Sequence, residues 1–132
     1  MSSFQQGFSD LRSALDGHGL NAGARYNVEL VFEEIVGNII RHAAPQGGEL
    51  RIELLLEVGA DFITMAFDDD GMPFDPCDHP DPVPPATLAE APDGGLGLMV
   101  VRRTASAMQY QRTPDGRNHL IITLRANPQS RA

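Results

Sequence analysis

Apolar residues recur every three or four positions in three stretches of the chain, and this spacing predicts three helices. The first stretch covers residues 3–17 and ends on Gly17, which makes it a short amphipathic helix. The second covers residues 22–44, about six turns, and is followed by the helix-breaking Pro45. The third covers residues 97–108 and follows a run of glycines.

Four further stretches alternate apolar and polar residues, which is typical of half-buried strands. The first two are separated by a turn that contains Gly59, and the last two by Pro114-Asp115-Gly116, so each pair is expected to form a hairpin. The four predicted strands are residues 49–57, 61–69, 107–113 and 117–125. The order of elements favours an α+β fold: a two-layer α/β sandwich in which the helices cover one face of a mainly antiparallel sheet.

Residues 75–93 carry six prolines and show no usable period, which predicts a long loop. Loops of this length in compact domains are usually functional lids or disordered. We find no internal repeat and no sign of a second domain, so residues 1–132 are expected to form one domain with a flexible tail at 127–132.

Composition narrows the classes of partner. The chain has 132 residues and a net charge of −8, without a basic cluster longer than Arg102-Arg103. Nucleic-acid binding needs a positive footprint, so we expect no nucleic-acid partner. No apolar run of membrane-spanning length and no leader segment are present, and Cys77 is the single cysteine, so we expect a cytoplasmic protein without a membrane partner.

The long helix carries a stripe of residues four apart: Leu30, Glu34, Asn38 and His42. Three of them are polar. One interpretation is a solvated helix face, and the other is that the stripe lies at the margin of the core, where a cleft would form. The stripe does not decide between these interpretations.

The second strand ends in Asp68-Asp69-Asp70-Gly71. Strand alternation places Asp69 on the same face as the apolar residues and turns Asp68 and Asp70 away from it. A carboxylate on a buried face needs a donor, such as the exocyclic amine of adenine, and Gly71 would let a ring approach the backbone. The alternative is an acidic turn that merely ends a strand. A Ca²⁺ site fails because the ligand spacing is wrong.

A glycine run, Gly94-Gly95-Leu96-Gly97, directly precedes the third helix. The amides at a helix start, together with the helix dipole, make an anion site, which would bind phosphate without a lysine. The alternative is a simple tight turn. The run matches neither the Rossmann fingerprint nor the P-loop.

Taken together and in this order, the three features resemble the ATP-binding domain of the anti-sigma-factor serine kinases, small members of the Bergerat-fold superfamily. Residues 34–42 are similar to the family's Glu-x-x-x-Asn-x-x-x-His box, residues 69–75 to its Asp-x-Gly-x-Pro-Phe-Asp box, and residues 94–98 to its last glycine box. Residues 110–120 resemble its closing hairpin, and the likeness as a whole covers most of the chain.

The resemblance implies ATP and Mg²⁺ as cofactors and assigns roles to residues. Glu34 would be the general base, Asn38 would ligate Mg²⁺ and Asp69 would accept a hydrogen bond from the adenine amine. Only Glu34, and not Glu33, lies four residues before Asn38. The other residues that the resemblance implies around the nucleotide are His42, Gly71, Pro73, Gly94, Gly95, Leu96, Gly97 and Leu98.

The implied function is a serine/threonine protein kinase that phosphorylates a small antagonist protein of the anti-anti-sigma (STAS) type and also binds a sigma factor or a similar target. A homodimer is compatible with the resemblance. The alternative function is a catalytically weak or inactive regulator whose binding to a partner protein is gated by ATP. The catalytic half of a histidine kinase is less favoured, because the chain has no dimerisation helix with a phospho-acceptor.

The chain departs from the family at its beginning and in its lid. Members usually begin with a strand ahead of the first helix, and this sequence begins almost at the helix, so one sheet edge is expected to be missing, exposed or covered by a partner. The lid, residues 75–93, is short in comparison with the family and rich in proline. His18, His79 and His119 lie outside the boxes and are expected to be surface residues.

Overall fold

The computed structural model describes residues 3–43, 49–77 and 95–127. These residues form three helices and a four-stranded sheet, which confirms the predicted α+β class. The elements are α1 (Ser3–Asp16), α2 (Ala22–Ala43), β1 (Ile52–Val58), β2 (Phe62–Asp69), α3 (Gly95–Thr104), β3 (Ala107–Arg112) and β4 (Asn118–Arg125).

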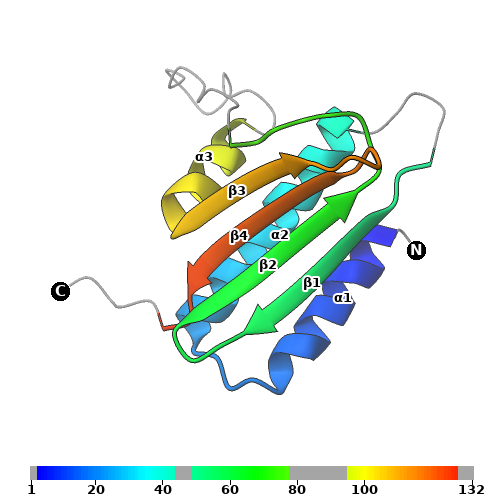
Figure 1. Ribbon diagram of the computed structural model, residues 1–132. Coiled ribbons are helices and arrows are strands. Elements are labelled where there is room, and N and C mark those ends of the chain that lie inside the picture. Colours follow the sequence, from blue (N-terminus) through cyan, green and yellow to red (C-terminus); the bar gives the residue numbers. More distant parts are fainter. Residues whose placement is uncertain (1–2, 44–48, 78–94, 128–132) are drawn as a thin grey trace, which may run out of the picture.

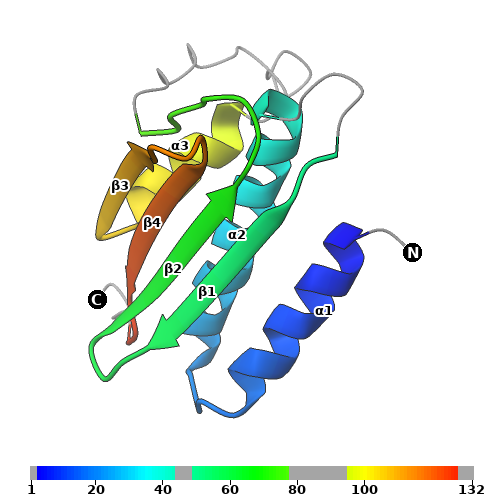
Figure 2. The same cartoon turned by 45° about the vertical axis from the view of Figure 1, so that its right-hand side comes forward.

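The four strands pair in the order β1-β2-β4-β3, and every pair is antiparallel. All three helices lie on one face of this sheet (Figure 1). The long helix α2 runs behind the central strands, while α1 lies toward the β1 side and α3 toward the β3 side, as the turned view also shows (Figure 2). The two predicted layers are therefore confirmed.

The core lies between α2 and the inward face of the two central strands. Ile35 of α2, Phe67 of β2 and Ile122 of β4 are all at most 1% exposed. The start of α2 is set by Asn21, whose side-chain oxygen accepts a hydrogen bond from the Ala24 amide at 2.8 Å. Because α2 is anchored along its length, the polar residues of its stripe are held in fixed positions beside the sheet.

The third helix differs from its prediction. It begins at Gly95 and ends at Thr104, whereas the apolar spacing predicted a helix over residues 97–108. After the helix the Ser106 amide bonds to the Thr123 carbonyl at 2.8 Å, which brings the chain into the sheet, and Met108 already pairs with Ile122 in β3. The predicted helix end was wrong because Met108 fits both the alternation of a strand and the spacing of a helix.

The loop prediction is tested only at its start. Residues 75–77 form neither a helix nor a strand, as expected, while residues 78–93 and the tail at 128–132 lie outside the described part of the chain. The predicted turn at 114–116 is present, with Gly116 at a positive φ of 82° that a residue with a Cβ rarely adopts.

Candidate nucleotide-binding site

Asp69 ends β2 with its side chain on the inward face, 3% exposed. Its Oδ1 accepts two hydrogen bonds at 2.9 Å, one from the Gly71 amide and one from Nδ2 of Asn118. Oδ2 accepts no hydrogen bond from the described part of the chain. The carboxylate is thus fixed by one oxygen, and its other oxygen is available to a ligand that can donate.

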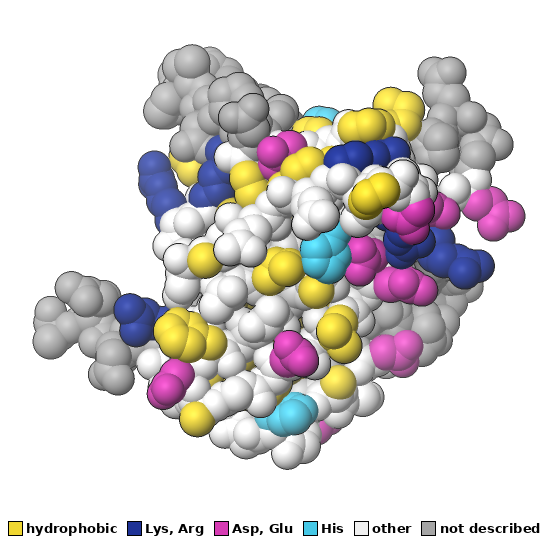
Figure 3. Space-filling view, viewed as in Figure 1, with side chains coloured by type: hydrophobic (Ala, Val, Ile, Leu, Met, Phe, Trp, Pro, Cys, Tyr) yellow, Lys and Arg dark blue, Asp and Glu magenta, His cyan; other side chains and the backbone are white. Residues whose placement is uncertain are grey.

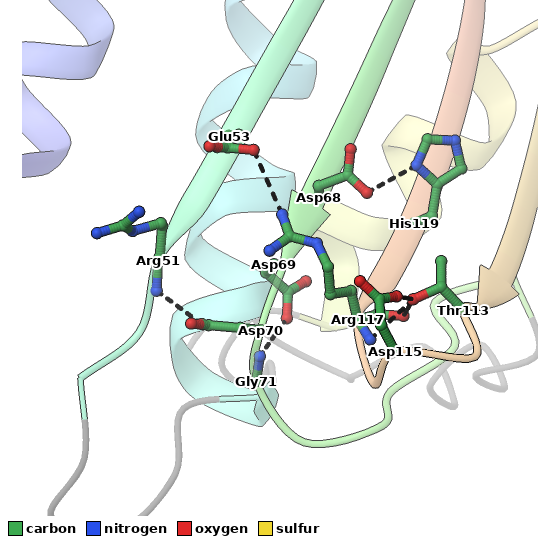
Figure 4. A network of polar contacts seen from close by, with 10 residues as sticks. All are labelled: Arg51, Glu53, Asp68, Asp69, Asp70, Gly71, Thr113, Asp115, Arg117 and His119. Carbon is green, nitrogen blue, oxygen red and sulfur yellow. Dashed lines mark hydrogen bonds and ion pairs between the residues drawn. The ribbon is translucent and has the colours of Figure 1, made fainter.

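The neighbouring carboxylates point elsewhere, as strand alternation predicted. Asp68 pairs with Nδ1 of His119 at 2.8 Å on the outer face of the sheet, and Asp70 accepts the Arg51 amide at 2.8 Å. Figure 4 shows Asp68, Asp69 and Asp70 turned in different directions. The three carboxylates thus do not converge on one point.

Asn118 begins β4 directly opposite Asp69 and is also 3% exposed. Its Nδ2 donates both to Asp69 and to the Met72 carbonyl at 2.8 Å, while its Oδ1 accepts from the Tyr110 hydroxyl at 2.5 Å. Arg112 donates to the same Oδ1 at 3.2 Å and to the Gly71 carbonyl at 2.9 Å. This network ties the end of β2 and the following turn to the β3–β4 hairpin.

Gly71 lies where the turn passes against the end of α2. A Cβ at this position would meet the Ala43 carbonyl oxygen, and it would stand 2.9 Å from the Ala43 carbonyl carbon. The Met72 amide donates to that same carbonyl oxygen at 2.7 Å. The glycine is therefore required by a backbone-to-backbone contact that brings the 69–75 box against the end of α2, one residue beyond the 34–42 box.

Asn38 and Asp69 both line a small pocket. The pocket is lined by α2, by the turn after β2 and by the hairpin, through Ile35, Asn38, Ile39, Ala43, Asp69, Phe74, Pro76, Tyr110, Asn118 and Leu120. Asn38 is 2% exposed, and its Nδ2 has no hydrogen-bond partner among the described residues. A buried amide that lacks a partner is costly to the fold and is expected to be satisfied by a bound group.

The pocket is narrow in this structure, about 10 Å³, which is room for roughly one water molecule. Phe74 and Pro76 line it from the turn after β2, and the Phe74 ring stacks on His42 with centroids 4.5 Å apart and planes 6° apart. Arg102 of α3 donates to the Pro76 carbonyl at 2.5 Å. A nucleotide base would have to move the Phe74 segment to reach Asp69.

Glu34 lies one helical turn before Asn38 and extends to the start of α3. A Cβ on Gly97 would collide with the Glu34 carboxylate, whose Cδ is 2.5 Å from that position. Gly97 stands in the first turn of α3, where unpaired amides and the helix dipole favour negative groups. The fold thus brings the predicted base and the predicted phosphate-binding glycines together.

The other residues that were predicted to surround the nucleotide lie in several different places. Gly95 and Leu96 begin α3, and Gly94 lies outside the described residues. Leu98 is 1% exposed and its side chain belongs to the core, so only its backbone could face a ligand. The His42 ring stacks on Phe74, and Pro73 is exposed.

Sequence reasoning did not identify Asn118, Tyr110 and Arg112 as parts of this site. Their contact with Asp69 depends on the register between β2 and β4, which local patterns do not give. One signal was available: Asn118 shares strand parity with Leu120, Ile122 and Leu124, and a polar residue at a buried position needs partners. Burial, the largest effect, raises the pKa of the Tyr110 hydroxyl above its usual value, which keeps it protonated as a donor.

Comparison with known proteins agrees with this geometry. Residues 6–124 match the model of the histidine kinase-like ATPase domain. The serine/threonine-protein kinase BtrW of Bordetella bronchiseptica is 33% identical over 110 residues, which cover 83% of this chain and 77% of that protein. Since the match to the domain covers most of the chain, the chain belongs to the histidine kinase-like ATPase family, and an ATP-binding, kinase-like domain is what its fold provides.

Among solved structures, the histidine kinase AdeS of Acinetobacter baumannii has a similar fold, with a TM-score of 0.50 and 23% identity. The match covers 79% of this chain and 48% of AdeS, so the chain spans about half the length of that protein. None of the helices in the described residues has the length and apolar character needed to cross a membrane.

Proposed function

We propose that this chain is an ATP-Mg²⁺-dependent serine/threonine protein kinase of the anti-sigma-factor type, whose substrate is a small STAS-type antagonist protein. The observation that carries the proposal is the position of the Glu34 carboxylate against Gly97, at the start of α3 and one helical turn from the unsatisfied Asn38 amide. The named similarity to a serine/threonine kinase supports the same class of reaction.

Adenine recognition is proposed for the Asp69 end of the site. Oδ2 of Asp69 would accept the exocyclic amine, while the Gly71 amide and Asn118 hold Oδ1. Burial makes this acceptor selective, because a base without a donor at that position would leave a buried carboxylate oxygen unpaired. Guanine carries an acceptor where adenine carries its amine and would be rejected.

Phosphate binding is proposed for the start of α3. The amides of Gly95, Leu96 and Gly97 point toward the amino end of the helix and would donate to phosphate oxygens. The Asn38 side chain would ligate Mg²⁺, which supplies charge neutralisation between the phosphates. Mg²⁺ would be held by Oδ1 of Asn38, while Nδ2, which has no hydrogen-bond partner among the described residues, would donate to a phosphate oxygen.

In the proposed reaction Glu34 accepts the proton of a serine or threonine hydroxyl on the partner protein. The hydroxyl oxygen forms a bond to the γ-phosphorus, the bond from that phosphorus to the bridging oxygen breaks, and ADP leaves with the electron pair. The helix holds Glu34 close to the amides that would bind phosphate, so the base and the reacting group are positioned by the same contact between α2 and α3.

A second candidate is an ATP-gated regulator that binds a partner protein without phosphorylating it. The narrow pocket favours this candidate, because ATP could enter only by moving the Phe74 segment and could thereby change a protein-binding surface. The two candidates share the nucleotide site and differ in whether Glu34 has a chemical role.

Glu34→Gln separates the two candidates. The kinase predicts that wild type transfers ³²P from Mg-ATP to serine or threonine of the cognate antagonist, and that the variant loses this transfer by about 100-fold or more while it keeps its ATP affinity. Glu33→Gln is the matched control and should transfer phosphate at the wild-type rate. Binding of ATP by wild type without any phosphorylated antagonist would instead support the regulator.

A further inference from the structure

The free edge of β1 has the features of a docking site for another strand. Within the described residues, β1 pairs with β2 on one side and with no strand on the other. Figures 1 and 2 show β1 at the rim of the sheet, with α1 on the helical face at the same side. An exposed strand edge offers main-chain donors and acceptors in a row, which is a template for pairing with another chain.

The register shows which main-chain groups face outward. The Asp70 amide bonds to the Arg51 carbonyl at 3.3 Å and the Gly59 amide to the Phe62 carbonyl at 2.9 Å, so residues 51 and 59 direct their main chain toward β2. Because antiparallel pairs alternate, the odd-numbered residues between them do the same. The amides and carbonyls of the even-numbered residues therefore point to the free edge: Ile52, Leu54, Leu56 and Val58.

The same four residues turn their side chains toward the helices, where they are only partly buried. Beside them lies a groove of about 550 Å³. Leu11 and Ala14 of α1 and Val36 and Ile40 of α2 form its other walls, and Ile40 is 47% exposed. The volume of the groove lies within the range of about 300–1,000 Å³ that small-molecule sites span, so the groove has room for several side chains of an added strand.

Charge on the outer face indicates what the added strand carries. The outward residues of β1 are Glu53, Leu55 and Glu57, and all three are exposed. Glu53 forms an ion pair with Arg117 at 3.3 Å, but its side chain is 63% exposed and can meet a second cation (Figure 4). In Figure 3 acidic side chains, with some basic ones among them, gather on the right-hand side, where β1 forms the sheet edge in the view of Figure 1. Opposite charges directly across two strands stabilise their pairing, and like charges destabilise it.

This charge pattern disfavours pairing with β1 of a second copy in the full-length register. If two β1 edges paired around a two-fold axis over their full length, Leu54 would face Leu56 of the second copy, and Glu53 would face Glu57 of the second copy on both sides of the axis. A strand with lysine or arginine at those two positions would meet opposite charges instead.

We propose that the β1 edge binds an extended segment of a partner protein that adds a strand to the sheet, places alternate apolar side chains in the groove and carries Lys or Arg opposite Glu53 and Glu57. Main-chain hydrogen bonds supply the affinity, and the groove and the two glutamates supply the selectivity. The segment is about as long as β1 itself, seven residues. This inference does not depend on ATP binding or on phosphoryl transfer.

The first test uses a fluorescein-labelled peptide of about nine residues in three forms. The peptide carries Val at alternate positions, which face inward, and Lys, Val and Lys at the outward positions between them. One form is unmodified, one is N-methylated at the inward Val residues and one is N-methylated at the outward residues. In a strand that adds antiparallel to β1 the inward residues direct their amides toward β1, so methylation of these amides should weaken binding by at least about tenfold, while outward methylation should change it by less than about twofold.

The second test reverses charge on both sides. Glu53→Lys/Glu57→Lys changes two exposed side chains and removes the exposed ion pair of Glu53 with Arg117, which contributes little to stability. The variant should therefore fold, which its unfolding midpoint verifies. It should bind the lysine peptide about tenfold more weakly and a glutamate version of that peptide more tightly, because each cross-strand charge pair is worth a factor of about 1.5 to 5.

Three results would overturn the proposal: no saturable binding of the unmodified peptide, equal binding of the two methylated forms, or the same response of both peptides to charge reversal. Light scattering that shows a dimer which the peptide cannot dissociate would assign the edge to a second copy instead.

Discussion

Replacing Gly71 by alanine should lower stability, whereas replacing Gly97 by alanine should not, although both glycines lie in the proposed nucleotide site. At Gly71 the added methyl group would meet the backbone of Ala43, which is fixed by the end of α2 and cannot yield. Overpacking of this kind costs about 1–3 kcal/mol, and strain on the bond from the Met72 amide to the Ala43 carbonyl adds about 1 kcal/mol. Gly71→Ala should therefore lower the free energy of unfolding by about 2–4 kcal/mol.

At Gly97 the added methyl group would meet only the carboxylate end of Glu34, a flexible side chain that can rotate away. Glycine within a helix is less stable than alanine by about 0.5–1 kcal/mol, so Gly97→Ala should leave stability unchanged or raise it by up to about that amount. The displaced Glu34 should nevertheless slow phosphoryl transfer. Gly37→Ala, whose methyl group would approach the tip of the Arg41 side chain at 3.3 Å, is the matched control that changes stability without touching Glu34.

Urea unfolding of the three variants measures these differences directly. Gly71→Ala should fall clearly below wild type, and Gly97→Ala and Gly37→Ala should lie at or above it. Equal destabilisation by Gly71→Ala and Gly97→Ala would refute the reasoning, because it would mean that the contact of the turn with Ala43 is no more rigid than the contact with Glu34.

Two further substitutions test the contacts that shape the site. Asn118→Ala removes the donor to Asp69 and to the Met72 carbonyl, so it should lower the free energy of unfolding by about 2–3 kcal/mol and weaken ATP binding. The control His119→Ala, on the outer face, should lower it by less than about 1 kcal/mol. Equal losses for the two variants in urea unfolding would count against the network. Arg102→Ala removes the hydrogen bond to the Pro76 carbonyl, so amide hydrogen exchange at Phe74 and Cys77 should accelerate while β2 stays protected. Unchanged exchange at Phe74 and Cys77 would show that this hydrogen bond does not hold the turn after β2.

The sequence alone was sufficient for the parts of the fold that depend on local pattern. The bounds of α1 and α2 were predicted to within one residue, because each has a clear apolar period and a breaker after it. Strand parity placed Asp69 inward and its two neighbours outward, as the structure has them. The end of α3 was missed because Met108 fits a helical period as well as a strand.

The parts that could not be predicted depend on contacts between distant segments. Asn118 reaches Asp69 across 49 residues of sequence, and only the pairing of β2 with β4 brings them together. The collision of a Gly97 Cβ with Glu34 depends on how α3 packs on α2. The stacking of Phe74 on His42 depends on the path of the turn after β2. The three sequence boxes were enough to name the candidate residues. How these residues lie relative to one another could be known only from the folded structure.

The central claim is that Asp69 and Asn38 are the two ends of an ATP-Mg²⁺ site. The most direct measurement is titration calorimetry of ATP with Mg²⁺, ATP with chelator and GTP with Mg²⁺, each against wild type and Asp69→Asn. We predict saturable binding of ATP-Mg²⁺ to wild type, weaker binding without the metal, no binding of GTP, and a loss of at least about 100-fold in ATP affinity for Asp69→Asn, since adenine then loses its charged acceptor. ATP binding that is unchanged in folded Asp69→Asn would contradict the claim.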